Sequence, residues 1–481
     1  MQDKKSTQKP NILMILVDQL AWRALSVYGG DGNTPAIDSL YDRGVAIDAC
    51  YCPCPLCQPS RAAFWSGVHS HRTDVLSNGR QWPITPIPET MPTLGETFVS
   101  AGYRTMHFGK RHDGGALRGF WCAPEKELPV EQRHPAWPYN MDTFADRYTV
   151  QEATRFLGEY GWDQPLLMVA DLVNPHNICG WIGENKGPHT DIRVPDKPGM
   201  PGVEDLPDLP DNFEFNDIDN RPIPVQYICC SHVRQSQTVG WTAENYRHYL
   251  AAYYHYLKCA DDDIAAILQS LDESGHRDDT LIVFFADHGD NMTSRGAVTK
   301  QVSLYEEVTR VPLIFSGAGV VPRRGPVQGL ASLIDLFPTL CSVASIPIPS
   351  GLDGVDISSV LREGTLPTRK YVSSEWTTEW GYTVSPGRML RSGRYKYMVY
   401  LEGNGEELYD LERDPGEKRN LVKDASCASV LERMRNLMAE YLSETGDTFY
   451  SQSWKADPRW RSHELGWRHH VGVAAPQYKG V

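Results

Sequence analysis

The stretch TLIVFFADHGD, from Thr280 to Asp290, decides the fold class of this chain. Its apolar run LIVFFA is followed directly by acidic and imidazole side chains, and NILMILVDQL, from Asn11 to Leu20, has the same arrangement. Continuous apolar strands of this length are typical of parallel sheets that are covered on both faces. The two segments therefore predict an α/β fold with a large, mostly parallel sheet sandwiched by helices.

Helical periodicity between the apolar runs supports the same fold class. TPAIDSLYDRG predicts a short helix that starts after Pro35 and stops at Gly44, and TLGETFVSAGYRTMHFGK predicts a helix, a turn and a strand. From Asn245 to Gly275, apolar residues recur at spacings of three and four, which predicts a helix of about eight turns. Helices thus alternate with buried strands, as a covered parallel sheet requires.

The character of the sequence changes at two places. Residues 183–243 are rich in Pro, Asp, Gly and Asn, and a loop of this length is usually functional, so we predict that it flanks the active site. After about residue 366, RMLRSGRYKYMVY and EELYDL predict antiparallel strands, and a helix follows near 425–445. We therefore expect a catalytic α/β domain at 1–365 and a smaller α+β subdomain with a short antiparallel sheet and a basic, aromatic tail at 366–481.

Composition excludes several classes of function. The chain has 61 acidic and 47 basic side chains, a net charge of −14, which argues against nucleic acid as a partner. No apolar run reaches the length of a membrane span, and the scattered cysteines are not typical of a disulfide scaffold. The polar start MQDKKSTQKP lacks the apolar core of a signal peptide. We expect a periplasmic or secreted protein if a signal peptide was removed, and otherwise a cytoplasmic one.

Polar residues follow two of the most apolar strands. Asp18 and Gln19 come directly after the first, and Asp287 and His288 after the second. Ligands bind beyond the carboxyl ends of strands in open parallel sheets, so these four side chains can converge there. Three oxygen-bearing side chains and an imidazole suit a divalent cation. The alternative is that each aspartate only caps the helix that follows it.

A run of cysteines occupies positions 50–57. Cys50, Cys52, Cys54 and Cys57 could hold zinc, but structural zinc sites usually pair two separated knuckles and no partner CxxC follows. A single reactive thiol is the other interpretation, for which Arg61 could stabilise the thiolate.

CQPSRAAFWSG, from Cys57 to Gly67, resembles the signature of the type I sulfatase family, C-x-P-S-R followed by Ser/Thr-Gly. The resemblance covers nearly the whole chain in order, through GYRTMHFGKRH, NPHN, FFADHGD, TKQVSLYEEVTRVPLI and EELYDLERDPGEKRNLV. It implies an alkaline phosphatase-like fold, sulfuric ester hydrolase activity and a bound divalent cation. It also implies that Cys57 is oxidised to formylglycine by a formylglycine-generating or cysteine-type sulfatase-maturating enzyme.

The resemblance implies which group is the nucleophile and which residues position it or offset the charge of the sulfate. The aldehyde made from Cys57 would hydrate to a geminal diol, of which one hydroxyl, activated by the cation, attacks sulfur and expels the alcohol. The second hydroxyl then loses its proton, and sulfate is released. Arg61 would hold the aldehyde and the metal carboxylates in place, while Lys110 and Lys300 offset the charge of the sulfate.

Two histidines complete the implied mechanism. His112 would take the proton from the second hydroxyl, and His176, with Lys300, would protonate the leaving alkoxide. Taken singly, each residue has a plainer interpretation: Lys300 as a solvated surface residue, and His112 as the ion-pair partner of Asp113.

The chain departs from the family pattern at three positions. Gln19 stands where many sulfatases have a second aspartate, and His288 where many have asparagine, which loosens the preference for Ca²⁺ and leaves Zn²⁺, Mn²⁺ and Mg²⁺ open. Arg111 replaces a frequent aromatic residue and adds a cation beside the pocket, unless it is only a surface arginine. We predict that Arg111 and Asn177 contact the substrate.

The overall resemblance is to bacterial sulfatases that act on glycosaminoglycan fragments. A uronate 2-O-sulfatase would explain Arg111 and the tail SWKADPRWRSHELGWRHHVG, from Ser453 to Gly472, whose aromatic and basic side chains could read an acidic sugar. The tail could instead dock on the body by its tryptophans, and a glucosamine or galactosamine sulfatase is a further candidate. The rivals are a phosphonate or phosphodiester hydrolase of the same superfamily, a non-catalytic sulfated-glycan-binding protein and a zinc-stapled structural domain.

Overall fold

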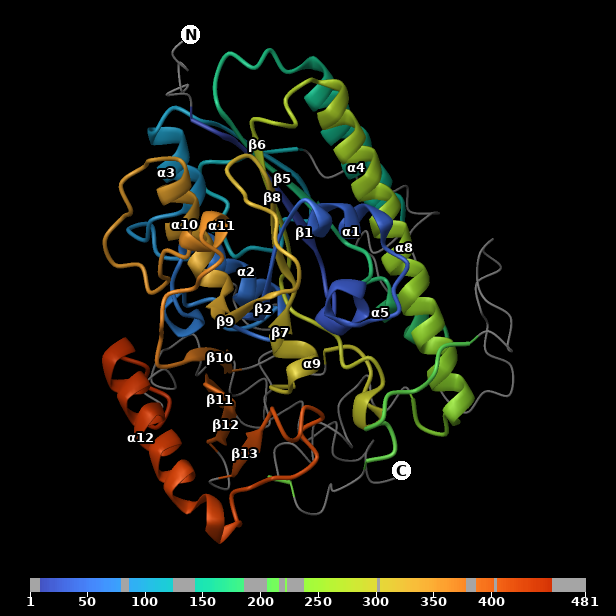
Figure 1. Ribbon diagram of the computed structural model, residues 1–481, viewed down its shortest axis with the longest axis vertical. Coiled ribbons are helices and arrows are strands. Elements are labelled where there is room, and N and C mark those ends of the chain that lie inside the picture. The colour runs from blue at the N-terminus through green and yellow to red at the C-terminus, as the bar shows by residue number, and fades with distance from the viewer. Residues whose placement is uncertain are drawn as a thin grey trace.

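The computed structural model describes residues 9–78, 86–123, 143–185, 206–215, 221–222, 238–300, 303–377, 386–401 and 405–451. Within these ranges a nine-stranded sheet has the order β4-β3-β5-β1-β6-β8-β2-β7, with β9 paired to β2 (Figure 1). Its strands are β1 (Asn11–Val17), β2 (Gly44–Tyr51), β3 (Arg104–Gly109), β4 (Trp121–Cys122), β5 (Leu166–Leu172), β6 (Thr280–Ala286), β7 (Arg310–Val311), β8 (Leu313–Gly317) and β9 (Val327–Ser332).

The centre of this sheet is parallel, as the apolar runs predict. β1 lies between β5 and β6 and pairs with both in parallel, and β5 continues in parallel to β3 and β4. On the other side, β8 is antiparallel to β6 and to β2. All seven residues of β1 are buried, because helices cover both faces of the sheet. The predicted mostly parallel α/β fold is confirmed, with this antiparallel part as its mixed edge.

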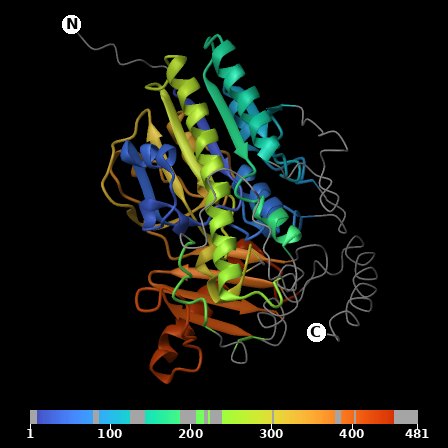
Figure 2. The ribbon, with the colours of Figure 1, turned by 90° about the vertical axis from the view of Figure 1, so that its right-hand side faces the viewer.

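Helices cover both faces of the large sheet. Figure 1 shows α3, α10 and α11 on one side of it and α1, α4 and α8 on the other, and Figure 2 shows α4 and α8 running side by side. Their bounds are α1 (Pro35–Asp42), α2 (Cys57–Ser66), α3 (Leu94–Ser100), α4 (Thr143–Glu159), α5 (Ile178–Glu184), α8 (Ala243–Glu273), α9 (Glu306–Thr309), α10 (Leu336–Val343) and α11 (Ser359–Arg362). No helix in the described ranges is both long and apolar enough to span a membrane.

The long helix predicted before Gly275 is confirmed as α8. It begins with a capping box, in which the Thr242 hydroxyl accepts from the Asn245 backbone and the Asn245 side chain accepts from the Thr242 backbone. It ends just before Gly275, whose φ of +76° is a left-handed conformation that glycine adopts without strain. The capped ends fix the position of the 31 residues between them, including the tyrosines that later contact the site.

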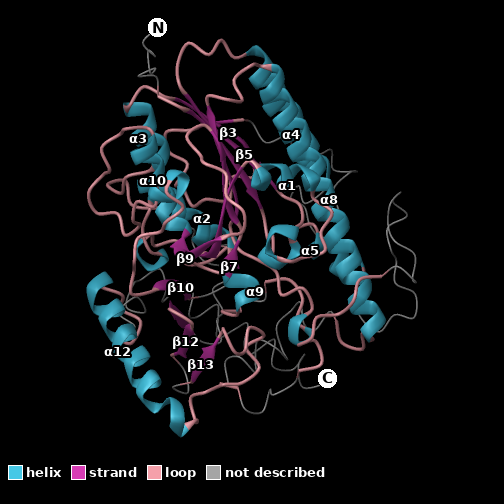
Figure 3. Cartoon of the chain, viewed as in Figure 1, coloured by secondary structure: helices cyan, strands magenta, loops and turns pink. Residues whose placement is uncertain are grey.

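A second, antiparallel sheet follows the large one (Figure 3). It consists of β10 (Val372–Trp376), β11 (Gly387–Ser392), β12 (Tyr395–Tyr400) and β13 (Glu406–Asp410), and α12 (Ala428–Thr445) packs against it. The predicted antiparallel strands and the helix near 425–445 are confirmed. The division at residue 365 stays a prediction. Most of the predicted loop 183–243 and the tail after 451 lie outside the described residues.

An ion pair between a partly buried histidine and a buried glutamate joins the body that carries α2 to this second sheet. His71 lies soon after α2, and its Nδ1 is 3.0 Å from Glu375 Oε1 on β10 and 3.8 Å from Asp447 Oδ2 after α12. Its Nε2 is 3.2 Å from the backbone oxygen of Thr445. Arg388, on β11, donates two hydrogen bonds to Asp447. The ion pair therefore connects segments 304 residues apart in the sequence.

Candidate active site

Three neighbouring parallel strands bring carboxylates to one edge of the large sheet. Asp18 follows β1, Asp287 follows β6, and Asp171 is the penultimate residue of β5. All three side chains are fully buried. Because β1 pairs in parallel with both β5 and β6, the carboxylates meet at the carboxyl edge, where ligands bind in open α/β sheets.

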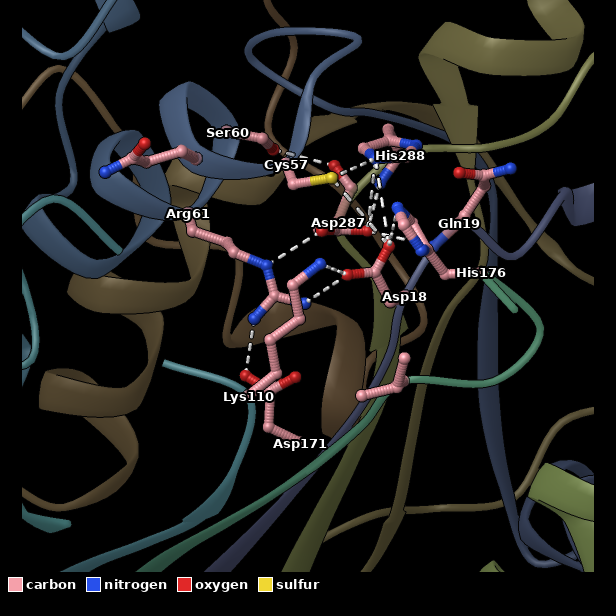
Figure 4. Close-up of polar contacts among 12 residues, drawn as sticks. Asp18, Gln19, Cys57, Ser60, Arg61, Lys110, Asp171, His176, Asp287 and His288 are labelled. Carbon is pink, nitrogen blue, oxygen red and sulfur yellow. Dashed lines mark hydrogen bonds and ion pairs between the residues drawn. The ribbon is translucent and has the colours of Figure 1, made fainter. Parts of the chain in front are cut away.

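Arg61, on α2, holds the three carboxylates together (Figure 4). Its Nε donates to Asp287 Oδ2 at 2.8 Å, Nη1 to Asp171 Oδ2 at 2.5 Å and Nη2 to Asp18 Oδ2 at 3.1 Å. Lys110, which follows β3, forms a further ion pair with Asp18. Burial opposes ionisation of Asp18, but the nearby cations, led by Lys110, hold its pKa below the usual range. Asp18 is thus an ionised acceptor inside the protein.

Cys57 begins α2, and its sulfur points into the same cluster. The Sγ atom is 3.1 Å from His288 Nε2, 3.3 Å from Lys300 Nζ and 3.9 Å from Asp18 Oδ1, and the His112 side chain also lowers the pKa of the thiol. Burial opposes the thiolate, but the charges of Lys110 and Lys300 hold the pKa of the Cys57 thiol well below its usual range. The position therefore favours an anionic or nucleophilic group.

The other cysteines of the run lie in a different setting. Burial raises the pKa of Cys50, Cys52 and Cys54 above the usual value for a thiol. Among the residues that the structure describes, the clusters of potential metal ligands include Cys57 but none of these three. The four thiols therefore do not converge as a zinc site would require.

Four side chains are placed to bind a cation. Ligand atoms of Asp18, Cys57, Asp287 and His288 all lie within 4.8 Å of one another. Asp18 Oδ1 is 4.0 Å from His288 Nε2, too far for a hydrogen bond. Metal–ligand distances of about 2.0–2.4 Å give ligand separations of about 3–4.5 Å, so the donor set fits a divalent cation. His288 Nδ1 is 2.9 Å from the Gly289 carbonyl oxygen, which leaves the Nε2 lone pair for the site.

Gln19 lies at the border of this cluster in a left-handed backbone conformation, with φ at +63°. Its backbone N–H donates to Asp287 Oδ1 at 3.1 Å. Its side-chain oxygen accepts from Lys300 Nζ at 3.0 Å and from Cys179 Sγ at 3.7 Å, and its Nε2 donates to Asp290 Oδ2 at 2.8 Å. The amide therefore joins Lys300 to a further buried carboxylate.

His176 and Asn177 lie in the loop between β5 and α5. His176 Nε2 is 3.1 Å from Lys300 Nζ. Burial, reinforced by the charge of Lys300, lowers the pKa of His176 to about 3, so its imidazole is neutral near neutral pH. Asn177 donates to Asn174 Oδ1 at 2.7 Å, and its own Oδ1 is buried with no hydrogen-bond partner among the described residues.

The structure brings most of the predicted residues into one cluster, in which Lys110 and His112 are partly exposed and the others are buried: Asp18, Gln19, Cys57, Arg61, Lys110, His112, His176, Asp287, His288 and Lys300. Asn177 is buried one residue after His176, and Arg111 is exposed one residue after Lys110. Sequence reasoning missed Asp171 and Asp290. For Asp171, the available signal was a carboxylate inside the apolar run LLMVADL.

Comparisons with known proteins agree with this arrangement. The sulfatase family model matches residues 10–346, and a model of the C-terminal part of N-sulphoglucosamine sulphohydrolase matches residues 297–444. A Δ4,5-hexuronate-2-O-sulfatase from Bacteroides thetaiotaomicron is 44% identical over 479 residues, which is 98% of this chain and 96% of that protein. The matched ranges run through both sheets and span the positions of the cluster.

Solved structures show the same likeness. A 2-O GAG (glycosaminoglycan) sulfatase has a TM-score of 0.85 at 44% identity and covers 94% of this chain and 96% of its own. A phosphonate monoester hydrolase of Agrobacterium radiobacter has a TM-score of 0.72 at 22% identity, covering 92% of this chain and 97% of its own. At that lower identity the likeness extends to the fold alone.

Proposed function

The chain belongs to the sulfatase family and is a sulfuric ester hydrolase, and on that premise we propose that it removes the 2-O-sulfate of a Δ4,5-unsaturated hexuronate in glycosaminoglycan-derived oligosaccharides. The observation that carries this proposal is the 44% identity, over 98% of the chain, to a Δ4,5-hexuronate-2-O-sulfatase. The acidic cluster at the sheet edge and its surrounding cations supply the chemistry that such a reaction needs.

The charges of the site match the two anionic groups of this substrate. Lys300 is buried with its Nζ 3.3 Å from Cys57 Sγ, and the charge of Lys110 also lowers the pKa of the Cys57 thiol, so both can offset the charge of the sulfate ester. Arg111 is exposed beside Lys110 and has the planar fork that binds carboxylates. We assign the uronate carboxylate to Arg111, and a further polar contact to the buried oxygen of Asn177, which has no hydrogen-bond partner among the described residues.

Cys57 is the position of the nucleophile in this proposal. After oxidation by a formylglycine-generating or cysteine-type sulfatase-maturating enzyme, its hydrated aldehyde would supply the attacking hydroxyl. Arg61 binds the three carboxylates and fixes α2 against the sheet edge, which orients position 57. We assign removal of the second hydroxyl proton to His112, whose side chain also lowers the pKa of the Cys57 thiol.

The leaving alcohol needs a proton donor because a sugar alkoxide leaves poorly. Neutral His176 accepts a hydrogen bond from the Lys300 ammonium, so the two side chains together hold one transferable proton next to Cys57. We assign protonation of the leaving oxygen to this pair.

A divalent cation fits the donor set of the site. Asp18, Asp287 and His288 would hold it, and the predicted fourth ligand, Gln19, borders the same space with its oxygen on Lys300. The bound cation would polarise the sulfate and acidify the attacking hydroxyl. Ca²⁺ is our first assignment, and the imidazole donor keeps Zn²⁺, Mn²⁺ and Mg²⁺ as alternatives.

The test combines peptide mass spectrometry at Cys57 with a panel of unsaturated disaccharides sulfated at one position each. We expect an aldehyde at position 57 and turnover of the uronate 2-O-sulfate that exceeds turnover of 6-O- and N-sulfated isomers by about a hundredfold. The Cys57→Ala variant is the matched control and should lack turnover. Faster hydrolysis of a phosphonate or phosphate diester would favour the rival hydrolase, and tight binding without turnover by converted protein would favour a glycan-binding role.

A further inference from the structure

Lys300 is a buried ammonium group whose charge is left available. Its side chain is 1% exposed, and Nζ contacts Gln19 Oε1, Cys57 Sγ and His176 Nε2. Within the described ranges no carboxylate lies within ion-pair distance of it, whereas Lys110 pairs directly with Asp18. A buried cation without a carboxylate partner is costly, so its position must be imposed by other contacts.

The amide of Gln19 imposes that position, and its orientation is fixed by chemistry. The ammonium of Lys300 can only donate hydrogen bonds, and Asp290 Oδ2 accepts one from the side-chain nitrogen of Gln19. The Gln19 oxygen must therefore face Lys300, at 3.0 Å, and its nitrogen must face Asp290, at 2.8 Å. Rotation of the amide by half a turn would lose both hydrogen bonds and place two donors against each other.

Asp290 is itself held on both oxygens. Its Oδ1 accepts from the Met292 backbone N–H at 2.8 Å, and the Tyr249 hydroxyl lies 2.8 Å and 2.9 Å from the two carboxylate oxygens. The same hydroxyl accepts from the Thr299 backbone N–H at 2.9 Å, next to Lys300 in the chain. Asp290 and Tyr249 are fully buried, so solvent does not compete for these contacts.

We infer that Asp290, supported by Tyr249, is a positioning residue for Lys300 that acts through the Gln19 amide. The neutral amide separates the carboxylate from the ammonium, so Asp290 orients Lys300 without forming an ion pair that would use up its charge. Lys300 then keeps its charge for an incoming sulfate group. This inference rests on the proposed function, in which Lys300 faces the sulfate.

The Asp290→Asn substitution tests the orientation directly. The Met292 N–H requires an oxygen at the Oδ1 position, so the new amide nitrogen must face the Gln19 nitrogen. The Gln19 amide then turns and presents its NH₂ group to Lys300. We expect inorganic sulfate and the 2-O-sulfated disaccharide to bind about tenfold more weakly by calorimetry. The measurement uses a Cys57→Ala background, so it needs neither maturation nor turnover.

Three further variants separate positioning from general damage. Asp261→Asn alters another buried carboxylate, which accepts from backbone N–H groups of α1, and should leave sulfate affinity unchanged. Tyr249→Phe keeps the carboxylate and should give a smaller loss in the same direction, which keeps the inference testable if Asp290→Asn fails to fold. In a Lys300→Met background, Asp290→Asn should cause no further loss, because a residue that acts only through Lys300 has nothing left to position.

The outcomes also separate this inference from the proposed substrate. Unchanged sulfate affinity in Asp290→Asn, or an equal loss with and without Lys300, would overturn the positioning role. If the Cys57→Ala parent binds neither inorganic sulfate nor the disaccharide, the positioning role is overturned as well. A parent that binds sulfate but not the disaccharide would contradict the proposed substrate, while the sulfate measurements would still decide the role of Asp290.

Discussion

The ion pair between His71 and Glu375 should make the free energy of unfolding depend on pH, with the higher stability at the lower pH. Burial lowers the pKa of His71, but the charge and the hydrogen bond of Glu375, with a smaller contribution from Asp447, outweigh it and raise the pKa to about 9. Glu375 is 2% exposed and His71 12%, so solvent screens the pair little. Arg388 and His69 also face this cluster, and Arg388 opposes the charge of His71.

The magnitude follows from the difference between the folded and unfolded states. Relative to an ordinary value near 6.5, a pKa of about 9 corresponds to about 3 kcal/mol of folding free energy. Because the folded pKa is the higher one, this contribution is fully present below about pH 6.5 and is lost as the pH rises through about 9. The substitution His71→Asn keeps a hydrogen-bond donor and removes the charge, so it should remove this pH dependence.

Chemical denaturation at a series of pH values measures the effect. We expect the free energy of unfolding of the unmodified chain to exceed that of His71→Asn by about 3 kcal/mol near pH 6 and by much less above about pH 9. His276→Asn is the matched control, because His276 pairs with Asp279 at a more exposed site. A difference between His71→Asn and the unmodified chain that stays constant over this pH range would refute the reasoning.

Further predictions concern the active site. Arg61→Lys cannot make the three separate hydrogen bonds to Asp18, Asp171 and Asp287, and it should lower the free energy of unfolding of the unconverted protein by about 3–5 kcal/mol; a loss below about 1 kcal/mol in denaturant titration would contradict the bridging role. Dialysis against a chelator should abolish turnover and lower the melting temperature, and both should return with the correct divalent cation; full activity after exhaustive chelation would argue against a metal. His176→Ala should slow release of a sugar alcohol about a hundredfold, and release of nitrophenol from 4-nitrophenyl sulfate far less. Equal losses in kcat with both esters would contradict proton donation.

Long, continuous signals made much of the fold predictable. β1 and β6 are apolar over their whole length, and α8 repeats its apolar spacing for 31 residues between two recognisable ends. Asp18 and Asp287 were predictable for a related reason, since each stands where an apolar run stops. The antiparallel direction of β8 could not be predicted, because a continuous apolar run has the same pattern in a parallel and in an antiparallel strand.

The supporting residues of the site have no local signal. Asp171 interrupts an apolar run at one position only, which gives no periodicity, and its meaning appears when β5 is placed beside β1. Tyr249 looks like one more apolar position on α8, and its partner Asp290 lies 41 residues away. Such contacts depend on tertiary packing, so a single sequence contains the residues but not their pairing.

The burial of α2 sets a limit on when the protein can be activated. All ten residues of this helix are buried, including Cys57 and Arg61 of the signature. A modifying enzyme that reads this segment cannot reach it once the helix has packed against the sheet edge. If Cys57 is converted as we propose, oxidation competes in time with folding, and each molecule that folds first stays inactive. The active fraction of a preparation would then depend on how quickly the newly made chain meets that enzyme, and supplying the enzyme to folded protein would not raise it.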